Sequence, residues 1–286
     1  MAITVLLFFL TCGLAAQPAG YAEVTYANDY FGATDYYFTQ GIRLEYGRER
    51  WSAYLAQEGY TPTSIRADRI LYGDRPYAGA LYAGYRRRGN WTEAWRWRQT
   101  LSLGVVGPLS LAAEEQRWIH AQTGNVAPRG WRYQIANDLL LNYRLDVDRD
   151  LLVTRSLSLS AGAEGRVGTY RNRVGLHALL RAGRLPQEDR PGLRMALHLR
   201  PAAHLNLYDA TLQGGLFNGG SPYTLTAPEV RRVVGRLEAG VDVGGRSWGI
   251  RFTRTFLTRE FAGGRAHDWG TVVLRFGAEG AAYSSW

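Results

Sequence analysis

The 286-residue sequence lacks lysine, is nearly free of cysteine and has no long apolar run after its first residues. All 34 basic residues are therefore arginine. The single cysteine, Cys12, lies near the N-terminus, so a mature chain that begins after it has no disulfide and no thiol catalysis. Past residue 20 no apolar run approaches the roughly 18 residues that a transmembrane helix needs.

The excess of arginine limits the chemistry of the partners, because the formal net charge is +9. The planar fork of arginine binds phosphate and carboxylate groups bidentately. A basic excess of this kind fits nucleic acid, anionic lipid or lipopolysaccharide. No basic stripe is interleaved with a nucleic-acid-binding motif, so we expect no nucleic-acid partner.

Residues 1–19 resemble a signal peptide. The segment 3–10 is apolar, and 11–19 is small and weakly polar, as in an h-region followed by a cleavage zone. The alternative is a short buried segment. We expect cleavage after Ala16 or Ala19, and one domain over 20–286.

Beyond residue 20, apolar and polar residues alternate through much of the chain. Ile42, Leu44 and Tyr46, for example, alternate with glycine, arginine and glutamate. A period of two predicts β-strands with one apolar and one polar face. A soluble sandwich would also alternate. The length of the strands and the charged character of the polar face favour a membrane barrel with a wet lumen.

Twelve strands are predicted, an even number, as single-chain bacterial barrels require. Short turns, such as 47–49, 147–149 and 244–245, alternate with several long connections, at 59–76, 107–132 and 208–228. These features predict a twelve-stranded antiparallel transmembrane β-barrel of the bacterial outer membrane, with the long connections outside the cell and a tail after Phe276. The predicted strands are 20–28, 38–47, 50–58, 77–87, 95–106, 133–146, 150–164, 173–184, 193–207, 229–242, 246–258 and 267–277.

Three polar clusters fall in consecutive long connections, and hence at one end of the barrel. The first lies within 28–41, the second within 74–79, and the third on a short helix between residues 108 and 124. On that helix Gln116 and His120 are spaced i, i+4 and share a face. Ser110 is the expected N-cap and Gly124 the expected C-cap.

These residue types fit metal-assisted ester hydrolysis. Histidine can act as a general base near neutral pH, and His120 is the candidate. Asp29 offers a carboxylate to a hard cation, with further oxygen from Asn28 or the nearby backbone. A cation that polarises a carbonyl, with a histidine that activates water, makes an ester hydrolase. No Gly-x-Ser-x-Gly elbow supports a serine nucleophile.

The same segments carry a resemblance to a known family. "NDYFGATDYYFTQGIRLEY", "YTP", "DRPYAGALYAG", "GVVGP", the step from Gln116 to His120 and "PRGWRYQI" occur in order over about residues 26–137. Together they resemble the lipid A 3-O-deacylase family of outer-membrane barrels. The resemblance implies a twelve-stranded barrel and a calcium-dependent esterase. It implies removal of the 3′-linked acyloxyacyl chain of lipid A, at a site between the barrel wall and a helix of an extracellular loop.

The resemblance also implies roles for individual residues. His120 resembles the general base, and Asn28 and Asp29 resemble the pair at the Ca²⁺ site. Thr39 resembles the threonine at the start of the second strand, and Gln116 would orient water or the helix. Asp74 and Arg75 match an Asp-Arg pair, with Arg75 expected to bind a lipid A phosphate or to orient Asp74. Some members carry an acidic residue shortly after the helix, where this chain has Asn125, Val126 and Ala127.

Simpler interpretations stay open. Asn28 and Asp29 can form only a turn, Asp74 and Arg75 a structural ion pair, and Thr39 an ordinary strand residue. The rival functions are an outer-membrane phospholipase or acyltransferase, and a non-catalytic barrel. In each case we expect outer-membrane lipids as surroundings and a monomer. Several aromatic residues are predicted to form interfacial girdles: Tyr77, Tyr82, Tyr85, Trp95, Trp97, Trp131 and Trp269.

Overall fold

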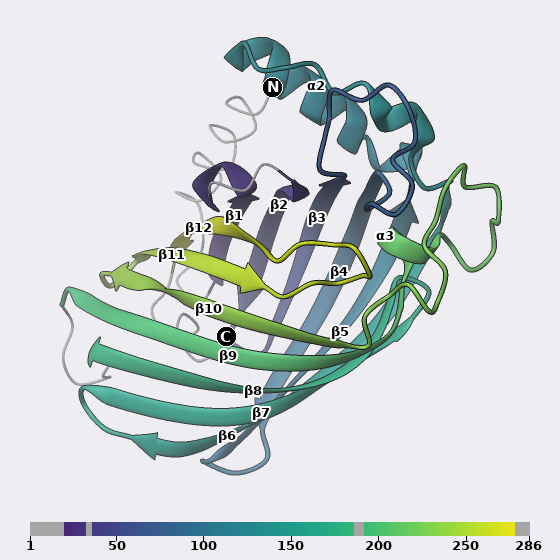
Figure 1. Cartoon of the computed structure of the whole chain (residues 1–286). Coiled ribbons are helices and arrows are strands. Elements are labelled where there is room, and N and C mark those ends of the chain that lie inside the picture. Colours follow the sequence, from purple (N-terminus) through teal and green to yellow (C-terminus); the bar gives the residue numbers. More distant parts are fainter. Residues whose placement is uncertain (1–19, 33–35, 186–191, 278–286) are drawn as a thin grey trace.

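The chain forms a closed antiparallel barrel of twelve strands, in which β1 pairs with β12 (Figure 1). The computed structural model describes residues 20–32, 36–185 and 192–277. The predicted fold class and the predicted number of strands are confirmed. The expected signal peptide, at 1–19, and the tail from 278 onward lie outside the described residues.

Each strand pairs with its neighbours in sequence, so the barrel is an up-and-down meander. Ten of the twelve described strands are at least eleven residues long, which is enough for a tilted span of a bilayer. The strands are β1 Gly20–Asn28, β2 Tyr37–Arg48, β3 Trp51–Thr61, β4 Ala78–Asn90, β5 Trp95–Val106, β6 Asp138–Val153, β7 Leu157–Gly168, β8 Arg171–Arg184, β9 Arg194–Asp209, β10 Val233–Gly244, β11 Trp248–Leu257 and β12 His267–Gly277.

The predicted turn at 147–149 is wrong, because β6 continues through it to Val153. The run of aspartates looks like a turn in sequence, but its members face the lumen. Asp146 binds Arg144 there, and Asp148 Oδ1 lies 2.7 Å from His177 Nε2. Charged residues that face the lumen can therefore resemble a turn in the sequence when few apolar residues lie between them.

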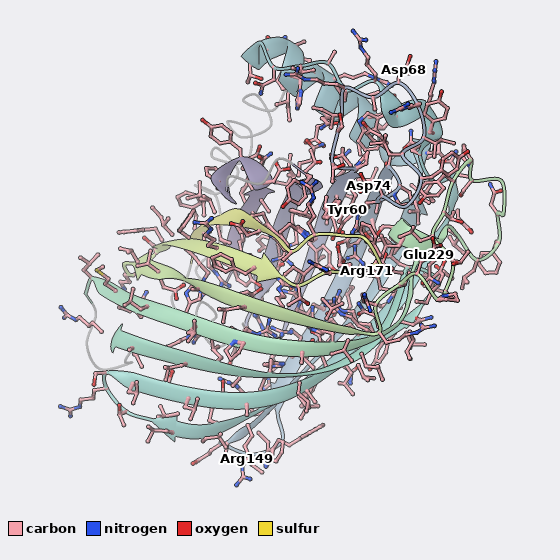
Figure 2. The ribbon with its side chains drawn as sticks, viewed as in Figure 1. Tyr60, Asp68, Asp74, Arg149, Arg171 and Glu229 are labelled. Atoms are coloured by element: carbon pink, nitrogen blue, oxygen red, sulfur yellow. The ribbon has the colours of Figure 1, made fainter. Side chains whose placement is uncertain are left out.

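The two faces of the wall have opposite character (Figure 2). Inward positions carry arginines and carboxylates in ion pairs, whereas outward positions carry exposed leucines such as Leu103, Leu176 and Leu197. The prediction of interfacial girdles is wrong for some of the predicted aromatic residues, because their large side chains pack under the loops or line the lumen. Tyr85 and Trp95 are exposed, but Tyr77 and Trp131 are buried beneath α2, and Tyr82 and Trp269 line the lumen.

The long connections gather at one end of the barrel, which we term the loop end (Figure 1). They carry the 3₁₀ helices η1 Asp29–Gly32, η2 Pro108–Ser110 and η3 Gly130–Tyr133, and the short helix α3 Ala210–Gln213. The helix expected near residues 108–124 is α2 Ala112–Thr123. Among the described residues, no helix has the length and apolar character needed to cross a membrane.

The two caps of α2 differ in how well the sequence predicts them. Gly124 is the C-cap as expected, with a φ of 69° that favours glycine. The expected N-cap, Ser110, is wrong by one position. Leu111 is the N-cap, in a left-handed conformation, and Ser110 closes the preceding turn η2.

Helix α2 begins against the outer surface of the wall rather than over the mouth of the lumen. The facing positions on β3 and β4 are Gly59 and Gly79, which are register partners and point outward. A Cβ atom at Gly79 would overlap Ser110 Oγ and lie 2.7 Å from Ala112 Cβ. The missing side chain therefore lets the start of α2 pack directly on the wall.

We expect Gly79→Val to loosen α2 while the barrel stays folded, because overpacking typically costs about 1–3 kcal/mol. Tryptic cleavage at the exposed Arg117 of α2, followed by mass spectrometry, should become roughly tenfold faster. Gly165→Val is the matched control, since a Cβ at Gly165 meets nothing within 4 Å. Equal cleavage rates in the two variants would contradict this account of helix docking.

Candidate active site

The outward face of β1–β3 changes from apolar to polar near the loop end. Lower on these strands the outward positions are Val24, Leu44 and Leu55. Polar side chains on a face that is otherwise apolar are not explained by packing against lipid. Such exceptions to the local pattern are expected at functional sites. We term this set the wall patch: Tyr26, Asn28, Gln40, Gln57 and Thr61.

The loop that carries α2 is bonded to the wall patch. Gln57 Nε2 donates to the backbone oxygen of Ser110 at 2.6 Å. Gln40 Nε2 donates to Glu115 Oε2 of α2, also at 2.6 Å. The patch is therefore one wall of a site whose other wall is the helix.

Asn28 and Asp29 lie where β1 ends and η1 begins. Asn28 Oδ1 accepts a hydrogen bond from the backbone N–H of Tyr30 at 2.8 Å, which forms the turn. Its Nδ2 donates to the hydroxyl of Tyr26 at 3.1 Å. The Asp29 side chain is buried, although it carries a carboxylate. The pair thus forms the expected turn and also brings an acid to the edge of the wall patch.

Glu115 was not among the residues predicted for the site. Both Glu115 and Asp29 act electrostatically on the Tyr26 hydroxyl. Burial raises the pKa of the Glu115 carboxyl from 4.5 to about 7. Sequence spacing could not reveal this contact, because Gln40 and Glu115 are 75 residues apart. The signal in the sequence that could have pointed to Glu115 was a second acid, next to Gln116, in the first turn of the helix.

Gln116 and His120 share a helix but have different surroundings. Gln116 is buried, and its Oε1 accepts a hydrogen bond from Trp131 Nε1 at 2.6 Å. It therefore fastens α2 to the segment that follows it. His120 is partly exposed in the last turn of α2, and its Nδ1 lies 2.6 Å from the backbone oxygen of Val126.

Thr39 occupies an irregularity of β2, where the register with β3 shifts between Phe38 and Gln40. Its Oγ1 lies 2.6 Å from Thr61 Oγ1, so the two hydroxyls share a hydrogen bond in the buried upper part of the wall. The bulge adds one residue to the strand. Thr39 thereby lies next to the wall patch in the same strand as Gln40.

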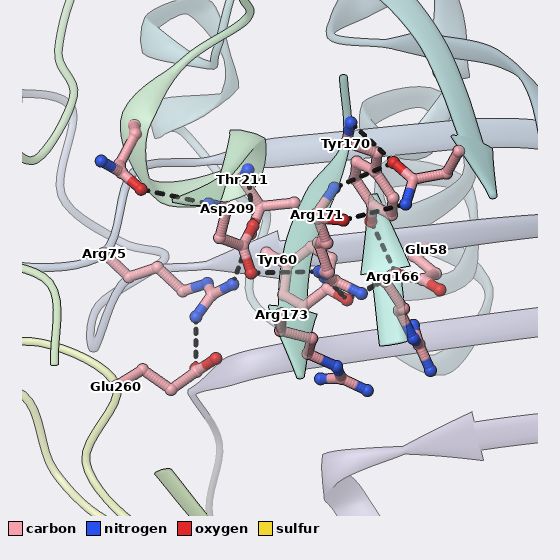
Figure 3. Close-up of polar contacts among 12 residues, drawn as sticks. Glu58, Tyr60, Arg75, Arg166, Tyr170, Arg171, Arg173, Asp209, Thr211 and Glu260 are labelled. Atoms are coloured by element: carbon pink, nitrogen blue, oxygen red, sulfur yellow. Dashed lines mark hydrogen bonds and ion pairs between the residues drawn. The ribbon is translucent and has the colours of Figure 1, made fainter. Parts of the chain in front are cut away.

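Asp74 and Arg75 lie apart from this cluster. Asp74 Oδ2 accepts hydrogen bonds from the backbone N–H and the hydroxyl of Thr63. Arg75 is 1% exposed. Its guanidinium donates to Glu260 and Thr211 and lies over the ring of Tyr60 (Figure 3). These contacts favour the structural alternative over a substrate-facing role, because Arg75 ties connections together inside the mouth of the barrel.

The oxygen chemistry of the site fits a hard cation better than a soft one. No group of three or more histidine, cysteine, aspartate or glutamate side chains that could hold a metal occurs in the described part of the chain. Asp29 supplies a carboxylate, and Asn28 Oδ1 has a second lone pair beyond the one used by Tyr30. Calcium accepts carboxylate, amide, backbone and water oxygens together, so it suits such a set.

The family of this chain is identified by a match over nearly its whole length. The family described as "Outer membrane protein LpxR" matches residues 1–277. The chain belongs to the LpxR family. LpxR from Salmonella typhimurium shares 19% sequence identity with it and superposes with a TM-score of 0.79, over 90% of this chain and 99% of that one. At this identity the likeness shows a common fold.

Other barrels are less similar. The beta domain of the Bordetella autotransporter BrkA gives a TM-score of 0.45 at 14% identity, covering 91% of this chain and 99% of that one. The NanC porin gives 0.43 at 8% identity, covering 90% of this chain and 99% of that one. Neither likeness bears on function. No curated protein matches the chain.

Family membership confirms the resemblance drawn from the motifs. The chain is an outer-membrane β-barrel of the lipid A deacylase family. The match covers the C-terminal half as well, where the motifs gave only a strand pattern.

The buried carboxyl of Glu115 predicts a pH-dependent stability. Because its folded-state pKa of about 7 lies above the ordinary 4.5, the folded protein favours the protonated form. Stability is then fully present below about pH 4.5 and is lost as the pH rises through about 7. Glutamine mimics the protonated acid, so the thermal midpoint of Glu115→Gln relative to wild type should rise between about pH 5 and pH 8.

The midpoint is measured by tryptophan fluorescence at both pH values. Glu114→Gln is the control, because that side chain is 60% exposed on the same helix. A difference between Glu115→Gln and wild type that does not vary with pH would show that the Glu115 carboxyl does not titrate in this range.

Proposed function

We propose that this protein hydrolyses the ester of the 3′-O-linked acyloxyacyl chain of lipid A, with the loop end at the extracellular surface. The observation that supports this most is the wall patch, a polar site on the lipid-facing side of the barrel and beneath a helix. Family membership supports lipid A as the substrate. A site in this position can receive a lipid laterally from the outer leaflet.

The surroundings of the site suit an amphiphilic substrate. Tyr30 and Phe31 of η1 are 86% and 41% exposed, and Leu109 and Leu111 beside α2 are also exposed. Phe31 packs edge to face against Phe252 on the outer side of β11. Apolar groups around a polar centre would hold acyl chains while an ester linkage reaches the polar groups.

His120 is proposed as the general base. A carbonyl oxygen can only accept, so the contact with Val126 requires that Nδ1 carry the hydrogen. In the neutral imidazole Nε2 is then the basic nitrogen. It takes a proton from water as the water oxygen bonds to the ester carbon. It returns the proton to the sugar oxygen as the carbon–oxygen bond breaks, leaving a carboxylic acid and a free hydroxyl.

Asn28 and Asp29 are proposed to hold Ca²⁺ at the edge of the wall patch. When bound, calcium would supply positive charge for the oxyanion of the tetrahedral intermediate. Thr39 and Gln40 would complete the polar wall that faces the ester. Gln116 would act through Trp131, by keeping α2 in position over that wall.

An outer-membrane phospholipase or acyltransferase is the second candidate. The observation that favours it is that the wall patch lies on the outward face of the barrel, which any ester lipid could approach. Release of fatty acid from glycerophospholipid, with lipid A unchanged, would select this alternative. A non-catalytic barrel would change neither lipid.

We expect His120→Ala to lower the deacylation rate by roughly 10²–10⁴-fold, the usual contribution of a general base. The assay is mass spectrometry of lipid A incubated with the folded barrel in detergent, in calcium or in chelator. Arg117→Ala, at an exposed position of the same helix, should retain activity. Full activity in a folded His120→Ala variant would remove His120 from the mechanism.

Loss of the Asp29 carboxylate should weaken the binding of a hard cation. Terbium luminescence sensitised by nearby tyrosines reports binding without any turnover. We expect Asp29→Asn to lose affinity by more than the roughly 10–100-fold that an outer-shell partner contributes. Asp68→Asn is the control, since Asp68 is an exposed acid at the same end and pairs with Arg132 (Figure 2). Equal binding in both variants would place the cation elsewhere.

A further inference from the structure

Three arginines lie directly opposite one another inside the barrel. Arg144 of β6 is the register partner of Arg166 of β7, and Arg166 is the register partner of Arg173 of β8. Like charges directly opposite on neighbouring strands destabilise a sheet. A row of three therefore needs compensating negative charge nearby. We term these residues the arginine row.

The protein supplies only part of that charge. The Glu164 carboxylate forms ion pairs with Arg144 at 2.7 Å, Arg173 at 2.9 Å and His204 at 3.1 Å, as N–O distances. The Arg166 Nε atom lies 3.7 Å from the same carboxylate, which is too long for a hydrogen bond. One carboxylate thus serves all three arginines of the row and an imidazole.

The neighbouring acid, Asp146, does not supply the missing negative charge. Asp146 lies opposite Glu164 in the ladder, but its charge is divided between Arg144 and Arg98. Within the described part of the chain, Arg166 Nε is buried and makes no hydrogen bond. The arginine row therefore keeps donor capacity that the surrounding side chains do not use.

The row faces an internal cavity of about 350 Å³, which is in the range of small-ligand pockets. A second cavity, of about 150 Å³, shares Arg144, Arg166 and His204 with it. The side chains of Arg144, Arg166 and Arg173 are 27%, 19% and 16% exposed, so they border the cavity and are not packed away from it.

The adjacent arginine has a different environment. Arg171 also lines the cavity, but it donates to Asp209 and Glu58 (Figure 3). Figure 3 shows the guanidinium ends of Arg166 and Arg173 turned away from that pair of acids. Arg171 is thus matched by acids of its own, whereas the three arginines of the row share Glu164.

We propose that the arginine row binds a phosphate-class oxyanion in the lumen of the barrel. Guanidinium groups donate in pairs to such anions with matching geometry. The anion would lie between Arg166 and Arg173 and complete the charge that Glu164 leaves unbalanced. This site is on the opposite face of the wall from the proposed ester site and does not depend on the proposed function.

Inorganic phosphate tests the site. Calorimetry on the folded barrel, in chelator and at constant ionic strength set with chloride, should show saturable binding. Arg166→Gln should weaken it roughly tenfold or more, because a charge-assisted donor is lost. Glu164→Gln should tighten it, because the competing carboxylate is gone. Arg149→Gln, which removes an exposed arginine at the other end of the barrel, should leave it unchanged (Figure 2).

Opposite effects of Arg166→Gln and Glu164→Gln would separate a binding site from a purely structural network. The proposal would be overturned if the wild-type protein bound phosphate no more tightly than chloride. It would also be overturned if Arg166→Gln and wild type bound phosphate equally. If Arg166→Gln does not fold, Arg173→Gln tests the same row. The thermal midpoint of wild-type protein in phosphate against chloride provides a further test without any variant.

Discussion

The pairing of β1 with β12 is the constraint on which the rest of the structure depends. Closure leaves the sheet with no free edge and divides space into a lumen and an outer surface. Because side chains alternate along each strand, every residue belongs to one of these environments. The polar character of Gln40 and Gln57 cannot then be explained by the lumen, since both reach the loop outside the wall. Closure therefore makes the wall patch a separate feature that requires its own explanation.

The position of α2 distinguishes this barrel from one that only lines a channel. A helix that gated a pore would lie over the mouth of the lumen, but α2 begins on the outer wall, at the glycines of β3 and β4. The mouth is instead crossed by Arg75, which joins the connection after β3 to Glu260 in the connection after β11. Loop contacts thus occupy the entrance, while the start of the helix lies on the outer side of the wall.

The sequence predicted the features that depend on local pattern. Alternation predicted twelve strands, and the order of long connections predicted that Asn28 and His120 lie at one end. It could not predict contacts that need the closed barrel. Gln40 meets Glu115 only because α2 folds back onto β2. Arg75 matched a motif, but its burial depends on Thr211 in α3 and on Glu260 in the connection after β11. The turn placed at 147–149 failed because an inward charge resembles a loop charge in sequence.

A single step along β3 separates the wall patch from the polar lumen. Gln57 of β3 reaches outward to Ser110, and Glu58, the next residue, binds Arg171 and three tyrosines inside. A register slip of one residue would exchange these faces, placing a carboxylate under the helix and an amide beside Arg171 in the lumen. The ion pairs of the lumen oppose such a slip, because each would lose its partner. The charged interior thereby fixes the register that keeps the wall patch on the outer surface of the barrel.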